Sequence, residues 1–311
     1  GIYVNDGKEH TFRDNSMTSY SGHFSERGSG IHLYKGSGHK VEGNYMAGVQ
    51  DGLYLDNTTD ITVLANEAAG SGYGFHFMFS EDLTVERNEL TKNVTGMMIM
   101  DSAGVKLREN EINEQFHVRG FGIILYDSDD LMLSNNEMKG NSTGLSMEKT
   151  RNVKITRNSI SGNQVGLEFI GENENNVFSE NNFIGNVVQS KIANSSMRLD
   201  DGSSGNYWDD YSSFDITGDG YGEITYKAGS LYDQLLEREP YWQLFFESPS
   251  IELWSKVESL FPSIGAADVY DEKPLVNPVD LEDQDREGER NVGVLLMAVP
   301  LLWFSTMIIW L

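Results

Sequence analysis

Histidine and methionine recur in this chain at spacings that would bring them together in a repeating structure. Met98 follows His76 by 22 residues, and His32 precedes His76 by twice that interval. Met100 follows Met78 by 22 residues as well. Thioether and imidazole groups suit copper, above all Cu(I), and are poor ligands for Mg²⁺ or Ca²⁺. Five residues are therefore candidate copper ligands, with simple decoration of an exposed strand as the alternative: His32, His76, Met78, Met98 and Met100.

A second set of candidate ligands lies about two thirds of the way along the chain. Asp215, Thr217 and Asp219 place side-chain oxygens at alternate positions. Gly220 follows them, as a glycine does in the first half of an EF-hand calcium loop. Position twelve would be Tyr226 instead of a chelating glutamate. The segment is either a calcium site or a Gly/Asp turn that ends the repeats.

The element that must position the histidines and methionines is a glycine-led repeat. It reads GLYLDN at Gly52, GFHFMF at Gly74 and GMMIMD at Gly96, and most of its eight units are 22 residues long. Short runs of alternating apolar residues separated by Gly and Asn are typical of strands. An asparagine stands 14 residues after each of the first seven leading glycines, and in the eighth unit it comes one residue later. A leucine-rich repeat is the competing solenoid, but its signature is missing.

We therefore predict an all-β fold, a right-handed parallel β-helix with three short strands per coil and an internal asparagine ladder. The second and fourth residues after each leading glycine would face outward, with neighbouring coils about 4.8 Å apart. His76 would then lie beside Met98, and Met78 beside Met100. Insertions at 22–29 and 115–121, with His23 and His117, would overhang this face. We assign His10 and His39 to other parts of the surface.

Four segments are expected. Residues 1–205 would form the β-helix, which we expect to be preceded by further residues because the chain starts at Gly1. Residues 206–262 would cap it with the Asp/Gly loop and amphipathic helices, and residues 263–291 read as an acidic linker. Residues 292–311 carry no charge and are long enough for a transmembrane helix. The aromatic residues of the amphipathic helices are candidate partner-binding residues: Tyr241, Trp242, Phe245, Phe246, Trp254 and Phe261.

Composition excludes several classes of function. The formal charge is −25, from 48 acidic and 23 basic residues, and such a surface repels nucleic-acid phosphates. The absence of cysteine excludes disulfides, Cys-ligated zinc and thiol catalysis. On the outward face Asp56 stands among Tyr, His and Met, with Glu148 and Glu168 three or more coils away. We see no catalytic constellation and predict that the protein is not an enzyme.

The segment after the repeats resembles the NosD family. The resemblance covers residues 1–262 and is most specific in NYWDDY at 206–211, in Asp215–Glu223, in SLYDQLLER at 230–238 and in Ser248-Pro249. It implies an extracytoplasmic or periplasmic protein that serves copper-site maturation of nitrous oxide reductase. It further implies an ABC transporter as partner, through its membrane and ATPase subunits, and contact with nitrous oxide reductase or a copper chaperone.

Two other kinds of function stay open. The repeat is shared with carbohydrate-binding and carbohydrate-active β-helices, including lyase- and epimerase-like ones. Clustered acids beneath the inserted loops would favour that alternative, whereas a Met/His cluster favours copper. A surface adhesin would bind no ligand there at all.

Overall fold

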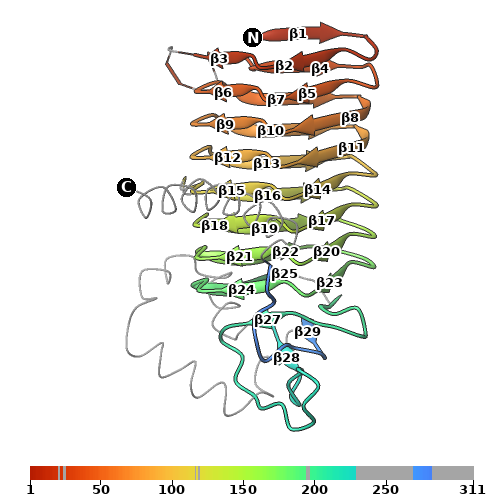
Figure 1. The fold of residues 1–311 in the computed structure, drawn as a ribbon, viewed down its shortest axis with the longest axis vertical. Coiled ribbons are helices and arrows are strands. Elements are labelled where there is room, and N and C mark those ends of the chain that lie inside the picture. The colour runs from red at the N-terminus through yellow and green to blue at the C-terminus, as the bar shows by residue number, and fades with distance from the viewer. Residues whose placement is uncertain are drawn as a thin grey trace, which may run out of the picture. The chain divides into compact units, whose positions relative to one another are not determined.

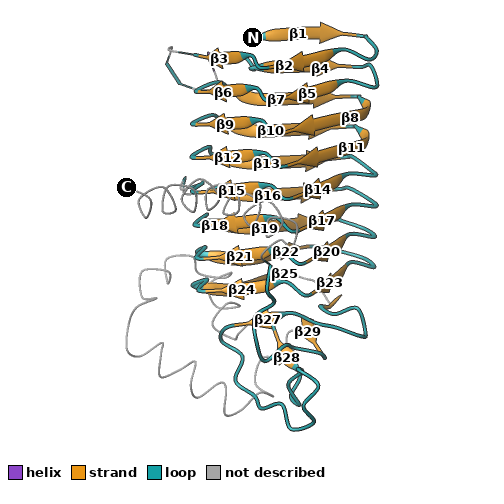
Figure 2. Ribbon diagram, in the orientation of Figure 1, coloured by secondary structure: helices purple, strands orange, loops and turns teal. Residues whose placement is uncertain are grey.

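The structure is a computed structural model that describes residues 1–19, 22–23, 26–115, 117, 120–193, 197–228 and 269–281. Residues 1–279 form one compact unit, and the fold described below is that of this unit. It is a parallel β-solenoid of about eight coils with three strands in most coils, as the repeat predicts (Figures 1 and 2). The described residues contain no α-helix.

Three parallel sheets run along the solenoid. Sheet A contains nine strands, in this order: β1 (Ile2–Asn5), β4 (Ile31–Tyr34), β7 (Asp51–Asp56), β10 (Tyr73–Met78), β13 (Thr95–Met100), β16 (Phe121–Tyr126), β19 (Thr143–Glu148), β22 (Val165–Ile170) and β25 (Val188–Ala193). Sheet B contains eight: β2 (Thr11–Arg13), β5 (Lys40–Glu42), β8 (Thr59–Leu64), β11 (Glu81–Glu86), β14 (Lys106–Arg108), β17 (Met132–Ser134), β20 (Lys154–Thr156) and β23 (Val177–Ser179). Sheet C contains nine: β3 (Ser16–Thr18), β6 (Tyr45–Ala47), β9 (Glu67–Ala69), β12 (Glu89–Thr91), β15 (Glu111–Asn113), β18 (Glu137–Lys139), β21 (Ser159–Ser161), β24 (Asn182–Ile184) and β27 (Tyr207–Trp208).

The coils stack so closely at the leading glycines that a side chain would not fit there, so only glycine is compatible with this position. A Cβ atom on Gly74 would lie 2.5 Å from the carbonyl oxygen of Gly96 in the next coil. The residues one and three positions after the glycine point inward, and Phe75 and Phe77 are fully buried. The repeat therefore fixes which side chains of sheet A form the core and which face outward.

The predicted asparagine ladder is present and runs through the solenoid. The side-chain amide of Asn66 donates to Asn88 Oδ1 in the next coil (3.0 Å) and to the carbonyl oxygens of Val41 (2.9 Å) and Leu64 (3.1 Å). Such bonds satisfy the side-chain amide and tie each coil to its neighbours at this corner. The ladder has nine members: Asn15, Asn44, Asn66, Asn88, Asn110, Asn136, Asn158, Asn181 and Asn206.

A second polar ladder stands five residues after the first, and the sequence reasoning missed it. Its amides and hydroxyls accept the backbone N–H of the equivalent residue one coil earlier, as Asn163 Oδ1 does from Asn141 (2.8 Å). Its members are Ser71, Asn93, Gln115, Asn141, Asn163 and Asn186. The spacing was visible in the sequence, but Ser and Gln at two positions obscured the period.

The end of the solenoid is closed by a small cap built on Trp208. Its indole stacks on Phe183 at a ring-centroid distance of 4.0 Å and on Tyr226 at 4.5 Å. Sheet D lies in this cap and consists of β26 (Met197–Arg198), β29 (Val269–Asp271) and β28 (Tyr226–Lys227), with β29 in the middle. The cap therefore joins the NYWDDY segment to residues more than 60 positions later.

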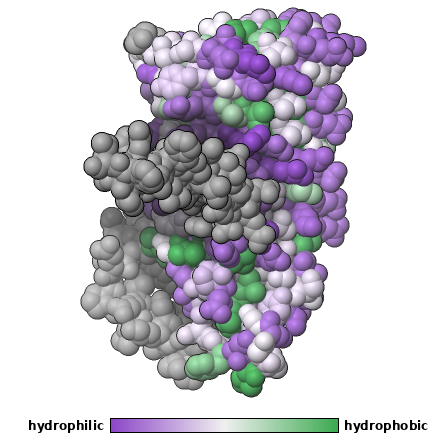
Figure 3. All heavy atoms as spheres, viewed as in Figure 1, coloured by the Kyte–Doolittle hydropathy of each residue, from purple (hydrophilic) through white to green (hydrophobic). Residues whose placement is uncertain are grey.

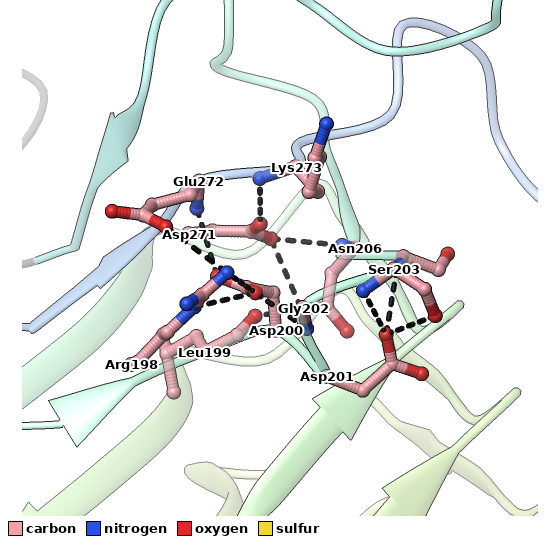
Figure 4. A network of polar contacts seen from close by, with 11 residues as sticks. Arg198, Leu199, Asp200, Asp201, Gly202, Ser203, Asn206, Asp271, Glu272 and Lys273 are labelled. Carbon is pink, nitrogen blue, oxygen red and sulfur yellow. Dashed lines mark hydrogen bonds and ion pairs between the residues drawn. The ribbon is translucent and has the colours of Figure 1, made fainter.

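Strand β29 lies within 263–291, the interval for which the sequence predicts an acidic linker. Val269 and Asp271 are both fully buried. The Asp271 carboxylate accepts hydrogen bonds from the backbone and side chain of Asn206 (2.8 and 3.1 Å; Figure 4) and from Trp208 Nε1 (3.1 Å). The acidic composition concealed this strand, because a buried acid that accepts several hydrogen bonds looks like a solvated acid in the sequence.

Several predicted features lie outside the described residues. They are the amphipathic helices of residues 230–262 with their six candidate partner-binding aromatics, and the membrane-spanning helix of residues 292–311. These stay predictions. Within the described part of the chain, no helix is long and apolar enough to cross a membrane.

Candidate functional site

The outward side of sheet A brings four of the five candidate copper ligands together. Strands β10 and β13 pair so that His76 lies opposite Met98 and Met78 lies opposite Met100. All four side chains are half-buried. We call this two-by-two arrangement the soft-donor patch: His76, Met78, Met98 and Met100.

The fifth candidate, His32, lies apart from the patch. Tyr54 stands between the two histidines, since it pairs with His32 on one side and with His76 on the other. Nε2 of His32 is buried and has no hydrogen-bond partner. Burial lowers the pKa of His32, although Asp56 and Asp51 act in the opposite direction. Burial therefore favours the neutral imidazole, the form that can bind a metal.

Aromatic rings form a continuous column along the same face. The ring centroids of Tyr3 and His32 are 4.9 Å apart, those of His32 and Tyr54 4.4 Å, and those of Tyr54 and His76 4.9 Å. Tyr73 stacks on His76 as well, at 4.7 Å. From His32 to His76 the rings are tilted by at most 33° from one another, so their faces cover each other and their edges face outward.

Tyr54 contacts the soft-donor patch twice, through its ring at His76 and through its hydroxyl at Met78. Its hydroxyl lies 3.4 Å from Met78 Sδ and 3.5 Å from Asp56 Oδ2, so it donates to one or the other. Burial, followed by the charges of Asp56 and Asp51, raises the pKa of Tyr54. Tyr54 therefore stays a neutral hydrogen-bond donor beside a candidate thioether ligand.

A buried carboxylate that the sequence reasoning missed completes the site. Asp51 precedes the leading Gly52, and its side chain is only 6% exposed. Its Oδ1 lies 3.2 Å from His76 Nδ1, and Ser29 Oγ donates to its Oδ2 at 3.2 Å. The position before the glycine stands outside the two-residue alternation, so the pattern did not mark it. The polar or aromatic residues at this position, Asp51 and Tyr73, were the available signal.

The other histidines are placed as follows. His39 is fully buried, so its assignment to the surface was wrong, whereas His10 is exposed. The two rings stack at 5.2 Å. His39 stands 22 residues before Ile61 and occupies the same inward position one coil earlier. The repeat period was the signal for its burial. Residues 22–29 and 115–121 are described only in part, and whether they overhang sheet A stays a prediction.

The candidate calcium loop is folded on its own backbone. Asp215 accepts hydrogen bonds from the N–H groups of Gly218 (2.6 Å), Gly220 (2.8 Å) and Asp219 (3.2 Å). These bonds, led by that of Gly220, lower the pKa of Asp215. The carboxylate thus serves a turn in this state, and calcium binding at Asp215, Thr217 and Asp219 stays a prediction.

The carboxylates of sheet A are spread along the sheet, and the one that lies beside a histidine is Asp51. Glu168 forms an ion pair with Lys191 (2.8 Å) and accepts a hydrogen bond from Ser146 (3.3 Å). Asp56 is on β7, four strands away from Glu148 on β19 in the sheet order. Nowhere in the described residues do three His, Asp or Glu side chains gather as a metal site would require.

Comparison with known proteins identifies the family. Residues 13–213 match the family described as "Periplasmic copper-binding protein (NosD)". This chain belongs to the NosD family. Two relatives are each named "Probable ABC transporter binding protein NosD". The one from Stutzerimonas stutzeri is 36% identical over 113 residues, 36% of this chain and 26% of the relative. The one from Pseudomonas aeruginosa is 34% identical over 119 residues, 38% of this chain and 28% of the relative. The matched segments thus span about a quarter of each relative's length.

Solved structures resemble the NosD-family chain only distantly. The periplasmic alginate epimerase AlgG covers 57% of this chain and 46% of its own, with 19% identity and a TM-score of 0.43. An alginate lyase from Paenibacillus covers 65% and 90%, with 14% identity and a TM-score of 0.25. Similarities this low transfer no substrate or reaction to the present protein.

Proposed function

We propose that this protein is an extracytoplasmic copper-handling protein that holds Cu(I) transiently on the soft-donor patch. It would work with an ABC transporter in assembling the copper sites of nitrous oxide reductase and would catalyse no reaction itself. The observation that carries the proposal is the register of β10 and β13, which sets His76 beside Met98 and Met78 beside Met100. Membership of a family described as periplasmic and copper-binding agrees with it.

The chemistry of the patch suits delivery better than storage. Three thioethers and one imidazole are neutral, soft ligands that match Cu(I) and discriminate against hard cations. The four side chains are half-buried on an open sheet, so a partner could reach the metal directly. His32 is separated from the patch by Tyr54 and would offer a further point of contact along the face.

Carbohydrate binding fits the same face less well. A sugar packs its apolar face on the face of an exposed aromatic ring, but the rings of His32, Tyr54 and His76 cover one another. The sheet A carboxylates Asp56 and Glu148 are four strands apart. Asp51 does lie beside a histidine, but it is 6% exposed and its two oxygens are engaged by His76 and Ser29, so it is not free to act on a substrate. The geometry therefore favours metal over sugar.

The partner part of the proposal rests on the relatives, which are named as ABC transporter binding proteins. We infer that this chain is the extracytoplasmic partner of such a transporter, which consists of membrane and ATPase subunits. The aromatic residues predicted for that contact, and a membrane anchor at 292–311, lie outside the described residues. The copper site can be tested independently of them.

The direct test is a titration of the protein with Cu(I) against a competing chelator. Replacing both Met98 and Met100 with leucine keeps their volume and apolarity, so the fold should be retained. Affinity should fall at least about tenfold, which corresponds to about 1.4 kcal/mol. Met132→Leu, a half-buried outward methionine of sheet B, is the matched control and should change nothing. Unchanged affinity in the double variant would refute the site.

A further inference from the structure

We propose that Asp51 is a positioning residue that keeps the proton of His76 on Nδ1, so that Nε2 faces copper with its lone pair. This inference rests on the proposed copper function and names the part of the site that prepares the imidazole. A neutral imidazole carries one proton, and the nitrogen that bears it cannot bind a metal. Which nitrogen is protonated therefore decides whether His76 can serve as a ligand through Nε2.

The contacts of Asp51 select one tautomer. An ionised carboxylate accepts hydrogen bonds and donates none, so His76 Nδ1, 3.2 Å from Oδ1, must be the donor. The other oxygen, Oδ2, accepts from Ser29 Oγ at 3.2 Å. Both oxygens are thus engaged in a side chain that is 6% exposed, where an unpaired carboxylate would be costly.

The ring of His76 is also held from both neighbouring tyrosines. Tyr54 stacks on it at 4.9 Å with an interplanar angle of 26°, and Tyr73 stacks at 4.7 Å and 28°. Stacking fixes the plane of the imidazole, and the bond to Asp51 fixes its rotation within that plane. The nitrogen opposite Asp51 is Nε2, and Met98 occupies the paired position on the next strand.

The arrangement also has an electrostatic consequence. The soft-donor patch contains only neutral ligands, so a bound Cu(I) would bring an uncompensated positive charge. Asp51 would supply a negative charge on the far side of the His76 ring from the metal. Its hydrogen bond would also make the His76 imidazole a stronger electron donor. Removing such a carboxylate partner of a ligating histidine typically lowers metal affinity about 10- to 100-fold.

The test uses two measurements on the same protein, an NMR spectrum and a Cu(I) titration. Nitrogen-15 NMR of the metal-free wild type should show His76 protonated on Nδ1, and Asp51→Ala should shift it to a mixture of tautomers. In the Cu(I) titration, Asp51→Ala should bind at least about tenfold more weakly than the wild type. Glu148→Ala removes the same charge from the same sheet without a histidine contact and should change neither reading.

The outcomes separate the two proposals. A wild type that binds no Cu(I) would overturn the proposed function itself. A wild type that binds Cu(I), with Asp51→Ala binding equally well, would overturn only the role of Asp51. Finding the His76 proton on Nε2 in the metal-free wild type would overturn that role without any variant, so the inference is testable even if Asp51→Ala does not fold.

Discussion

The outward face of sheet A and the cap around Trp208 are both rich in aromatic and polar side chains. They differ in how far the polar groups are satisfied by hydrogen bonds. In the cap, Asp271 is fully buried and accepts hydrogen bonds from Asn206, Trp208 and Lys273. On sheet A, His32 has a buried nitrogen without a partner, and the methionine sulfurs stand half-buried beside an imidazole. In the cap the buried polar groups satisfy one another and hold the fold together, whereas the half-buried side chains of the soft-donor patch stand in a fixed register where a ligand can reach them.

The largest effect should follow from breaking the saturated network of the cap. Asp271→Ala would leave the Trp208 indole N–H and the backbone N–H of Asn206 buried without an acceptor, which costs about 3 kcal/mol of unfolding free energy. Urea denaturation measures this loss. The neighbouring Glu272, whose side chain is 47% exposed and pairs with Arg198, is the control, and Glu272→Ala should cost less than about 1 kcal/mol.

The loss of stability in Asp271→Ala should not be accompanied by a loss of copper binding. Under conditions where Asp271→Ala is still folded, its Cu(I) affinity should equal that of the wild type, because the soft-donor patch belongs to other coils. A stability loss accompanied by a proportional loss of affinity would show that the two regions are not independent.

The cap and the first coils of the solenoid should also respond oppositely to pH. Burial raises the pKa of Asp271 to about 6, although the hydrogen bonds from Trp208 and Asn206 act against it. The folded state then binds this proton more tightly than the unfolded chain. The stability from Asp271 is full below the unfolded pKa of 3.8 and is lost as the pH rises through about 6. A shift of this size corresponds to about 3 kcal/mol.

His39 in the first coils has the opposite sign. Burial, followed by the neighbouring His10, lowers the pKa of His39 from 6.5. The stability that it contributes is present above pH 6.5 and is lost as the pH falls through its folded-state pKa.

Hydrogen-exchange protection factors at about pH 5 and about pH 7.5 test both regions in one experiment. Lower pH should protect residues 206–208 more and residues 39–41 less. Parallel changes at both ends would contradict the account.

The smallest effect is expected on sheet C, whose outward face carries an in-register row of glutamates. Glu89 pairs with Glu67 on one side and with Glu111 on the other, and Glu111 pairs with Glu137. Like charges opposite one another destabilise a sheet by a few tenths of a kcal/mol to about 1 kcal/mol. Glu111→Gln should therefore raise the melting temperature slightly and leave Cu(I) affinity unchanged. A loss of affinity would mean that the overall negative field, and not the patch, attracts the metal.

The sequence predicts the solenoid and the soft-donor patch because both depend on one period. Once the leading glycines set the register, the neighbours of His76 and the asparagine ladder follow from counting residues. The same period places His39 at the inward position that Ile61 occupies in the next coil, and both residues are buried. Asp51 was out of reach of the pattern, since it precedes the glycine and lies outside the alternation of the strand.

The cap was less accessible for a different reason. Asp271 meets Asn206 across 65 positions of sequence, and no repeat relates the two. Figure 3 shows apolar residues exposed among hydrophilic ones at the cap end as well, and Phe214 and Ile216 are 83% and 80% exposed. Hydropathy therefore does not distinguish the buried parts of this segment from the exposed ones. A long-range polar contact leaves no local signature, so β29 could not be predicted.

If the register of β10 and β13 creates a Cu(I) site, one titration of three proteins should show it. Wild type, the Met98→Leu and Met100→Leu double variant and Met132→Leu would be titrated with Cu(I) against the same chelator. The account predicts that wild type and Met132→Leu bind alike and that the double variant binds at least about tenfold more weakly with an unchanged melting temperature. Equal binding by all three proteins would contradict it.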